Sequence, residues 1–237
     1  MTASRAPLTR DSLRLKITVQ RVRMDGTDFR VVSPAKPLKN GAFYRSRRSL
    51  DLYVDRPDGH RIGTLFLLAA RSPRTLVHLP MRTTATAPGV GWEDEKPLDL
   101  VLAHRAVQFR PTRWKKLRER LTAGNAPRET RTASVPESDL QAGHASGRAP
   151  WSDPDSSGLR QDEFAETLFL TGTTPALREA ARQVFAVTEE GPPAAASGLY
   201  IAGGCNYHVC RGLFTWEELQ AGGWDELHIE FSPPWAK

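Results

Sequence analysis

The densest group of side chains that could do chemistry lies near the C-terminus, beginning with the segment GGCNYHVC. Two cysteines and a histidine fall within six residues there, and a second histidine follows in a later segment of alternating apolar residues. These four residues are Cys205, His208, Cys210 and His228. Thiolate and imidazole groups are ligands that Zn²⁺ prefers in proteins. The group is therefore a candidate zinc site, and no other cofactor is indicated.

The spacing of the two cysteines is not that of a standard zinc knuckle, because the histidine lies between them. If residues 207–210 are extended, His208 and Cys210 share one face of a strand, while Cys205 need not reach them. The same residues then fit an ordinary core strand in which the cysteines act as small apolar side chains.

A third interpretation is nucleophilic catalysis by one of these cysteines. A histidine would act as the base, and Glu226 or Glu230 would orient it. Arg211, directly after Cys210, would favour the thiolate. An enzyme built on this group is thus one alternative function for the chain.

Charge is divided unevenly along the 237 residues, whose formal net charge is +6. Residues 1–121 hold 25 Lys and Arg against 11 Asp and Glu, a net charge of +14, and residues 122–237 carry a net charge of −8. A basic half of this kind favours an anionic partner, unless the acidic half neutralises it within the molecule.

Three basic segments are the candidate nucleic-acid interface. They are a strand over residues 13–19, a probable loop over residues 43–48 and a helix over residues 110–121. The candidate residues are Arg14, Lys16, Phe43, Tyr44, Arg45, Arg47, Arg48, Arg113, Lys115, Lys116 and Arg118. The cations would bind phosphates, and the two aromatic residues would stack on bases.

The leading functional hypothesis is therefore a nucleic-acid-associated protein that binds without sequence specificity. No helix-turn-helix or zinc-finger motif indicates base readout. A protein-interaction module of regulatory or immunity type, whose acidic half binds a basic partner, is the other alternative.

The predicted fold class is α+β. A mainly antiparallel β-sheet, or a partly closed barrel, is capped by the basic helix and followed by a smaller part that contains a βαβ unit. Residues 13–19 alternate as a half-buried strand, and residues 21–23 break the alternation as a bulge would. The apolar run at 62–70 reads as the second strand of a hairpin that turns at residues 57–59.

The helix over residues 110–121 has Thr112 as its predicted N-cap and Trp114, Leu117 and Leu121 on one apolar face. Near the C-terminus, a strand at 166–170 leads to a helix with Thr174 as N-cap and then to a loop at 191–198. A strand at 199–202 and a short helix opening at Thr215 complete the chain.

These elements divide the chain into three parts. Residues 1–121 form a basic β-rich domain, residues 122–161 a flexible linker or loop, and residues 162–237 a small acidic α/β part. The two structured parts may instead share one core. The chain contains no long apolar run and no signal-peptide pattern, so we expect a cytoplasmic protein that is not in a membrane.

Overall fold

The computed structural model describes residues 12–46, 49–85, 95–124, 126–141, 158–199, 208–214 and 225–233. Its strands are β1 Ser12–Met24, β2 Thr27–Pro34, β3 Gly41–Arg45, β4 Ser49–Val54, β5 Thr75–Leu79, β6 Lys96–Pro97, β7 Asp99–His104, β8 Glu129–Pro136, β9 Leu159–Glu163, β10 Thr167–Gly172, β11 His208–Phe214 and β12 Asp225–Phe231. Its helices are α1 Arg56–Arg71, α2 Trp114–Thr122, α3 Ser138–Gln141 and α5 Thr174–Ala194, with single turns η1 Arg105–Val107, η2 Pro111–Arg113 and η4 Ala195–Leu199.

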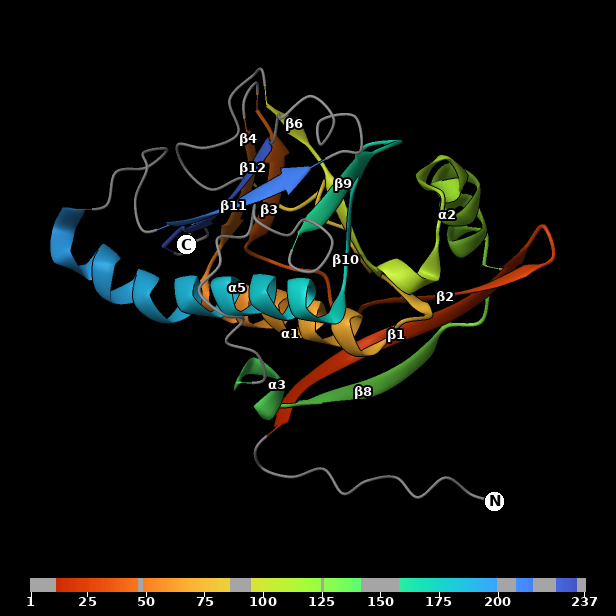
Figure 1. Ribbon diagram of the computed structural model, residues 1–237, viewed down its shortest axis with the longest axis horizontal. Helices are drawn as coiled ribbons and strands as arrows, with labels where there is room; N and C mark the ends of the chain where they lie inside the picture. Colours follow the sequence, from red (N-terminus) through yellow and green to blue (C-terminus); the bar gives the residue numbers. More distant parts are fainter. Residues whose placement is uncertain are drawn as a thin grey trace.

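These strands form one mixed sheet, so the chain belongs to the mixed α/β class with a large sheet. The strand order is β6-β3-β4-β12-β11-β9-β10-β7-β5-β2-β1-β8. The order is linear, with β6 and β8 at its two edges, and Figure 1 shows how strongly the sheet twists between them. The strands β12, β11, β9 and β10 of the C-terminal part lie together between two groups of strands from the basic part, and one apolar cluster contains residues from both parts.

Helices cover both faces of the sheet. Figure 1 shows α1 and α5 side by side on one face and α2 at the other side of the molecule. Alternate residues of β7 confirm the two faces, because Leu102 packs in the cluster with α1 and α5, whereas Val101 packs in the cluster with α2. The apolar face of α2 consists of Trp114 and two leucines, all of them buried.

Strand β1 passes from one of these clusters to the other. Ile17 and Val19 pack with α1, whereas Val22 and Met24 point to the opposite face and pack with α2. The pairing of β1 with β2 is continuous up to Met24, so the predicted bulge is absent. The alternation changes phase because the buried face of the strand changes.

Helix α1 replaces the predicted hairpin strand at residues 62–70. Asp55 caps the helix, because its carboxylate accepts a hydrogen bond of 2.8 Å from the backbone of Asp58, and Pro57 lies in the first turn. The helix lies between the sheet and α5, so it is apolar on most sides. A short apolar run of this kind looks the same in a buried strand and in a buried helix.

Helices α1 and α5 approach closely at glycines of α1. A Cβ atom on Gly59 would lie 2.2 Å from Cγ2 of Thr188, and one on Gly63 would lie 2.8 Å from the ring of Phe185.

Helix α5 is capped by Thr173, not by Thr174. It also continues through two prolines to Ala194, so the first four residues of the predicted loop at 191–198 are helical.

The N-terminus of α2 also differs from the sequence prediction. The turn η2 precedes it, Arg113 occupies the N-cap position, and no side chain caps the helix there, so Thr112 is not the cap. The indole of Trp114 donates a hydrogen bond of 3.0 Å to Thr167 Oγ1 in β10. Trp114 thereby fixes α2 to a strand of the acidic part.

Residues 129–136 of the predicted linker form strand β8, which pairs with β1 at the edge of the sheet. Only Ala133 and Val135 of this strand are buried. A half-exposed edge strand has a weak apolar pattern, and this explains why the segment reads as a linker. Residues 159–161, also assigned to the linker, belong to β9 inside the sheet.

The C-terminal part is not a parallel βαβ unit in the described residues. β9 lies between β10 and β11, antiparallel to the first and parallel to the second, so β10 and β11 run in opposite directions. The predicted strand at 199–202 and the predicted helix at Thr215 lie outside the described residues, apart from Leu199 at the end of η4. None of the described helices has the length and apolar character needed to cross a membrane.

Candidate metal centre

Three neighbouring strands bring the candidate ligands together. β11 pairs antiparallel with β12, and Cys210 lies opposite His228. β12 pairs in parallel with β4, and His228 lies beside Asp51. Neighbouring residues in register point to the same face of a sheet. The opposite face of β12 carries Ile229, which is buried in the core.

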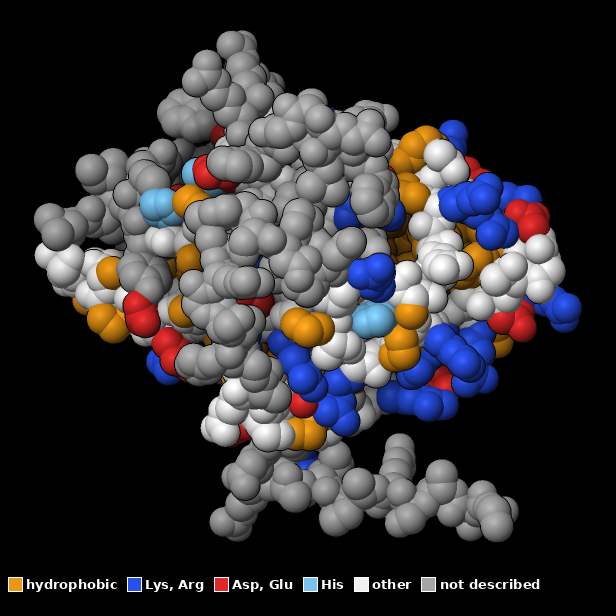
Figure 2. Space-filling view, in the orientation of Figure 1, with side chains coloured by type: hydrophobic (Ala, Val, Ile, Leu, Met, Phe, Trp, Pro, Cys, Tyr) orange, Lys and Arg blue, Asp and Glu red, His pale blue; other side chains and the backbone are white. Residues whose placement is uncertain are grey.

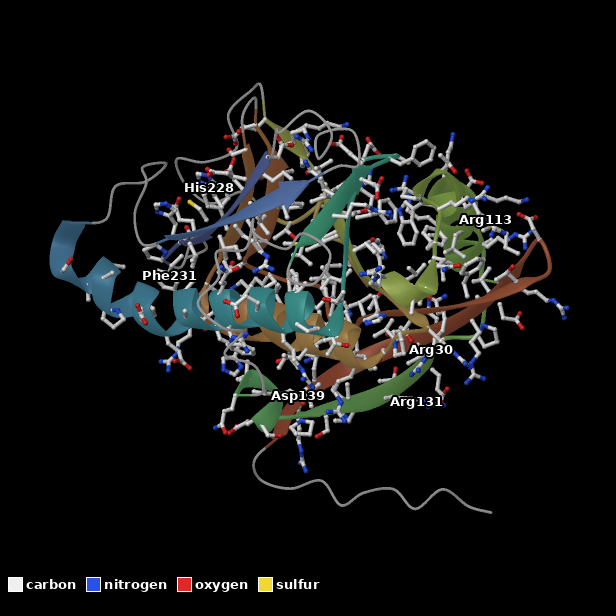
Figure 3. All side chains as sticks on the ribbon, viewed as in Figure 1. Arg30, Arg113, Arg131, Asp139, His228 and Phe231 are labelled. Atoms are coloured by element: carbon white, nitrogen blue, oxygen red, sulfur yellow. The ribbon has the colours of Figure 1, made fainter. Side chains whose placement is uncertain are left out.

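His208, Cys210 and His228 form a compact cluster on this face. One possible ligand atom from each residue lies within 4.8 Å of those of the other two. The imidazole rings of the two histidines are stacked, with centroids 5.6 Å apart and planes at 14°. Cys210 is exposed and the histidines are half-buried, so the cluster is open to solvent; Figure 3 shows a sulfur atom beside His228.

Two carboxylates flank the His228 ring. Nε2 of the ring lies 3.1 Å from Glu226, and Nδ1 lies 3.9 Å from Asp51. The hydroxyl of Ser49 donates to Asp51 at 2.9 Å, which holds this carboxylate in place. When one nitrogen of a histidine binds a metal, its second nitrogen usually donates to a carboxylate, which orients the ring. Glu226 is such a partner for Nε2, whereas Asp51 lies beyond hydrogen-bonding distance of Nδ1.

Arg211 lies next to Cys210 but points to the core side of β11. It is buried, and its guanidinium donates to Gln183 Oε1 at 3.1 Å and to the carbonyl of Ala176. Burial lowers the pKa of Arg211 to about 10. The group keeps its positive charge at neutral pH, but it lies on the side of β11 opposite to Cys210.

The structure brings together three of the four residues that the sequence indicates as metal ligands. Cys205 lies outside the described residues. Asp51 and Ser49 were not predicted, because they lie in β4, far away in the sequence. The parallel pairing of β4 with β12 places them beside His228, and no local sequence pattern predicts that pairing.

The two aromatic residues of the predicted nucleic-acid interface are in the core. Phe43 and Tyr44 belong to strand β3 and not to a loop, and they are 1% and 5% exposed. Side chains this buried have no face for a base to stack on, so their predicted role is wrong. Arg47 and Arg48 lie outside the described residues.

Several of the predicted cations already have carboxylate partners. Arg45 pairs with Glu163 at 2.5 Å and with Asp225 at 3.2 Å, both from the acidic part. In and beside α2, Arg113 and Lys116 share Asp25, each at 3.0 Å. Arg118 lies 3.7 Å from Asp99. Arg14 and Lys16 in β1 and Lys115 in α2 have exposed side chains.

Comparisons with protein-family models, with curated proteins and with solved structures found no match to this chain. The function must therefore be inferred from the geometry described above.

Proposed function

We propose that the chain is a zinc-binding protein whose metal is held by His208, Cys210 and His228. The observation that carries this proposal is the proximity of the three ligand atoms, within 4.8 Å of one another on one open face. In a tetrahedral zinc complex, neighbouring ligand atoms lie about 3.5 Å apart, as expected from bond lengths near 2.0–2.3 Å. Small side-chain rotations are enough to close the remaining distance.

Zinc suits this group better than other metals do. A thiolate together with two imidazoles matches a borderline-soft ion, whereas Mg²⁺ and Ca²⁺ prefer oxygen ligands. Three protein ligands leave a fourth position, which water or Asp51 would fill. A zinc ion with a bound water lowers the pKa of that water toward neutrality, and this supports hydrolytic chemistry at the site.

The Cys–His nucleophile is a weaker explanation of the same cluster. The contact of 3.1 Å between His228 and Glu226 fits a histidine base with an orienting carboxylate. However, this arrangement needs one imidazole, and it gives no role to His208, which is stacked on His228. A metal centre uses both.

Cobalt substitution tests the proposal, because Co²⁺ bound by a thiolate gives a charge-transfer absorption that Co²⁺ bound by nitrogen alone lacks. We expect the wild-type protein, in the reducing conditions predicted for its compartment, to bind one Co²⁺ with this absorption. Cys210→Ser should abolish the charge-transfer band, and His228→Asn should weaken binding. His60→Asn is the control, since His60 lies in α1 away from the cluster. Binding that is equal in all four proteins would refute the site.

Nucleic-acid association is a second proposed function, now carried by the exposed cations Lys16 and Lys115. The logarithm of the affinity should fall linearly with the logarithm of the salt concentration. The Lys16→Gln/Lys115→Gln variant should reduce that slope by about 1–2. Arg45→Gln should leave the slope unchanged, because its charge is already balanced within the molecule. Affinity that does not depend on salt would exclude this function.

A further inference from the structure

A separate group of arginines lies at the other end of the sheet, on the ribbon of β2, β1 and β8. Arg21 of β1 is directly opposite Arg30 of β2, and Arg131 of β8 is opposite Ile17 of β1. Arg21 and Ile17 are an even number of residues apart, so all three arginines point to the same face. Figure 2 shows a blue patch at the lower right of the view, where Figure 3 places Arg30 and Arg131.

Among the described residues, one carboxylate partly balances these three charges. Arg131 forms two hydrogen-bonded contacts of 2.7 Å with Glu129, which is itself exposed. Neither Arg21 nor Arg30 forms an ion pair with any of the residues that the structure describes. The arginine patch, Arg21, Arg30 and Arg131, therefore keeps an excess of positive charge.

Arg30 is the half-buried centre of this patch, and its Nε is buried without a hydrogen-bond partner. Burial lowers the pKa of Arg30, and the charges of Arg131 and Arg21 lower it further. Arg178 and Arg211 also have a buried Nε without a partner, but their Nη atoms bond to Asp139 and Gln183. Within the described residues, the guanidinium of Arg30 has no comparable bond.

A buried donor without a partner and a cluster of like charges both disfavour the unliganded state. One bound oxyanion would relieve the second of these, since it accepts from the accessible Nη atoms of Arg30 and neutralises the flanking cations. Guanidinium groups match phosphate oxygens in geometry as well as in charge.

We propose that the arginine patch is a phosphate-binding site, in which the Nη atoms of Arg30 bind the phosphate group and Arg21 and Arg131 flank it. None of these arginines belongs to the predicted nucleic-acid interface. Arg14 and Lys16, which do belong to it, lie on the opposite face of β1. The phosphate group is either free, as in a small phosphorylated ligand, or part of a nucleic-acid backbone. The site lies far along the sheet from the zinc ligands, so it does not depend on the zinc proposal.

Calorimetric titration with inorganic phosphate tests the site, with chloride at the same ionic strength as the reference. We expect wild-type protein to bind phosphate and Arg30→Gln to bind it about tenfold more weakly or worse. Arg30→Lys keeps the charge but lacks the planar pair of Nη donors, so it should also bind weakly. Lys39→Gln removes an exposed charge elsewhere and should bind as the wild type does.

Because Arg30 is half-buried, the exposed Arg131→Gln provides a second variant that should fold normally and bind less phosphate. A labelled single-stranded oligonucleotide then identifies the source of the group. If phosphate competes with the oligonucleotide and Arg30→Gln weakens both, the site binds a nucleic-acid backbone; if only phosphate binds, it takes a free phosphate group. No phosphate binding beyond the chloride reference, or an equal loss in Lys39→Gln, would overturn the proposal.

Discussion

Asp99 joins β7 to the segment after β5 and to helix α2, and replacing it with asparagine tests how these parts are held together. The carboxylate is buried. It accepts hydrogen bonds from the backbone of Met81 at 2.9 Å and from the backbone and side chain of Arg82 at 3.1 and 3.0 Å. His78 and Arg118 also face it, each at 3.7 Å. Asp99→Asn keeps the shape of the side chain but removes its charge.

The expected loss of stability follows from these contacts. Removing one partner of a buried ion pair costs about 3–5 kcal/mol. Arg82 keeps a second partner in Glu166, and asparagine can still accept a backbone hydrogen bond. We therefore expect Asp99→Asn to lower the free energy of unfolding at pH 7 by roughly 2–4 kcal/mol, or Tm by about 5–15 °C.

The pH dependence gives this prediction a second, independent readout. Burial raises the pKa of Asp99, but the nearby imidazole of His78 and the hydrogen bonds and charge of Arg82 outweigh it, so the pKa lies below its ordinary value of 3.8. A carboxylate with a lowered pKa stabilises the fold above its ordinary pKa and loses this effect as the pH falls through its pKa in the folded state. The difference between wild type and Asp99→Asn should therefore shrink below about pH 4.

Urea denaturation followed by circular dichroism at several pH values measures both effects. Asp28→Asn is the matched control, because Asp28 is exposed and forms no ion pair with the described residues. It should change the free energy of unfolding by less than about 0.5 kcal/mol. A loss for Asp99→Asn that is no larger than for Asp28→Asn, or that stays constant down to pH 2.5, would show that Asp99 does not act as described.

Two further predictions concern the packing of the helices. Gly59→Ala should destabilise the fold by about 1–3 kcal/mol in urea denaturation, because its Cβ would collide with Thr188, whereas alanine normally stabilises a helix. The control Gly212→Ala meets no atom within 4 Å and should be nearly neutral. Trp114→Phe should cost about 1–3 kcal/mol by leaving Thr167 without its donor, and adding Thr167→Val should recover part of this loss. Equal effects of both glycine substitutions, or strict additivity at Trp114 and Thr167, would contradict the packing described here.

Patterns that depend on a few neighbouring residues predict this structure well. The alternation at the start of β1 and the apolar face of α2 around Trp114 both appear as predicted. The expectation that His208 and Cys210 share one face of a strand is also met, because β11 is extended through both. In each case one side of the element is buried and the other is exposed, which makes the period visible.

Features that depend on distant pairing could not be predicted. Helix α1 packs against both the sheet and α5, so residues 62–70 form a nearly unbroken apolar run that a buried strand would also show. Phe43 and Tyr44 look like surface aromatics beside arginines, but β3 is paired on both sides and packs them inside. Asp51 joins His228 only because β4 and β12 pair in parallel across most of the chain length.

X-ray absorption at the zinc edge, on protein loaded with one equivalent of zinc, tests the proposed metal centre most directly. We expect one sulfur near 2.3 Å, from Cys210, and nitrogen or oxygen atoms near 2.0–2.1 Å with the scattering pattern of two imidazoles. Cys210→Ser should remove the sulfur contribution. A shell without sulfur in the wild-type protein, or one with two sulfur atoms, would contradict a centre made of His208, Cys210 and His228.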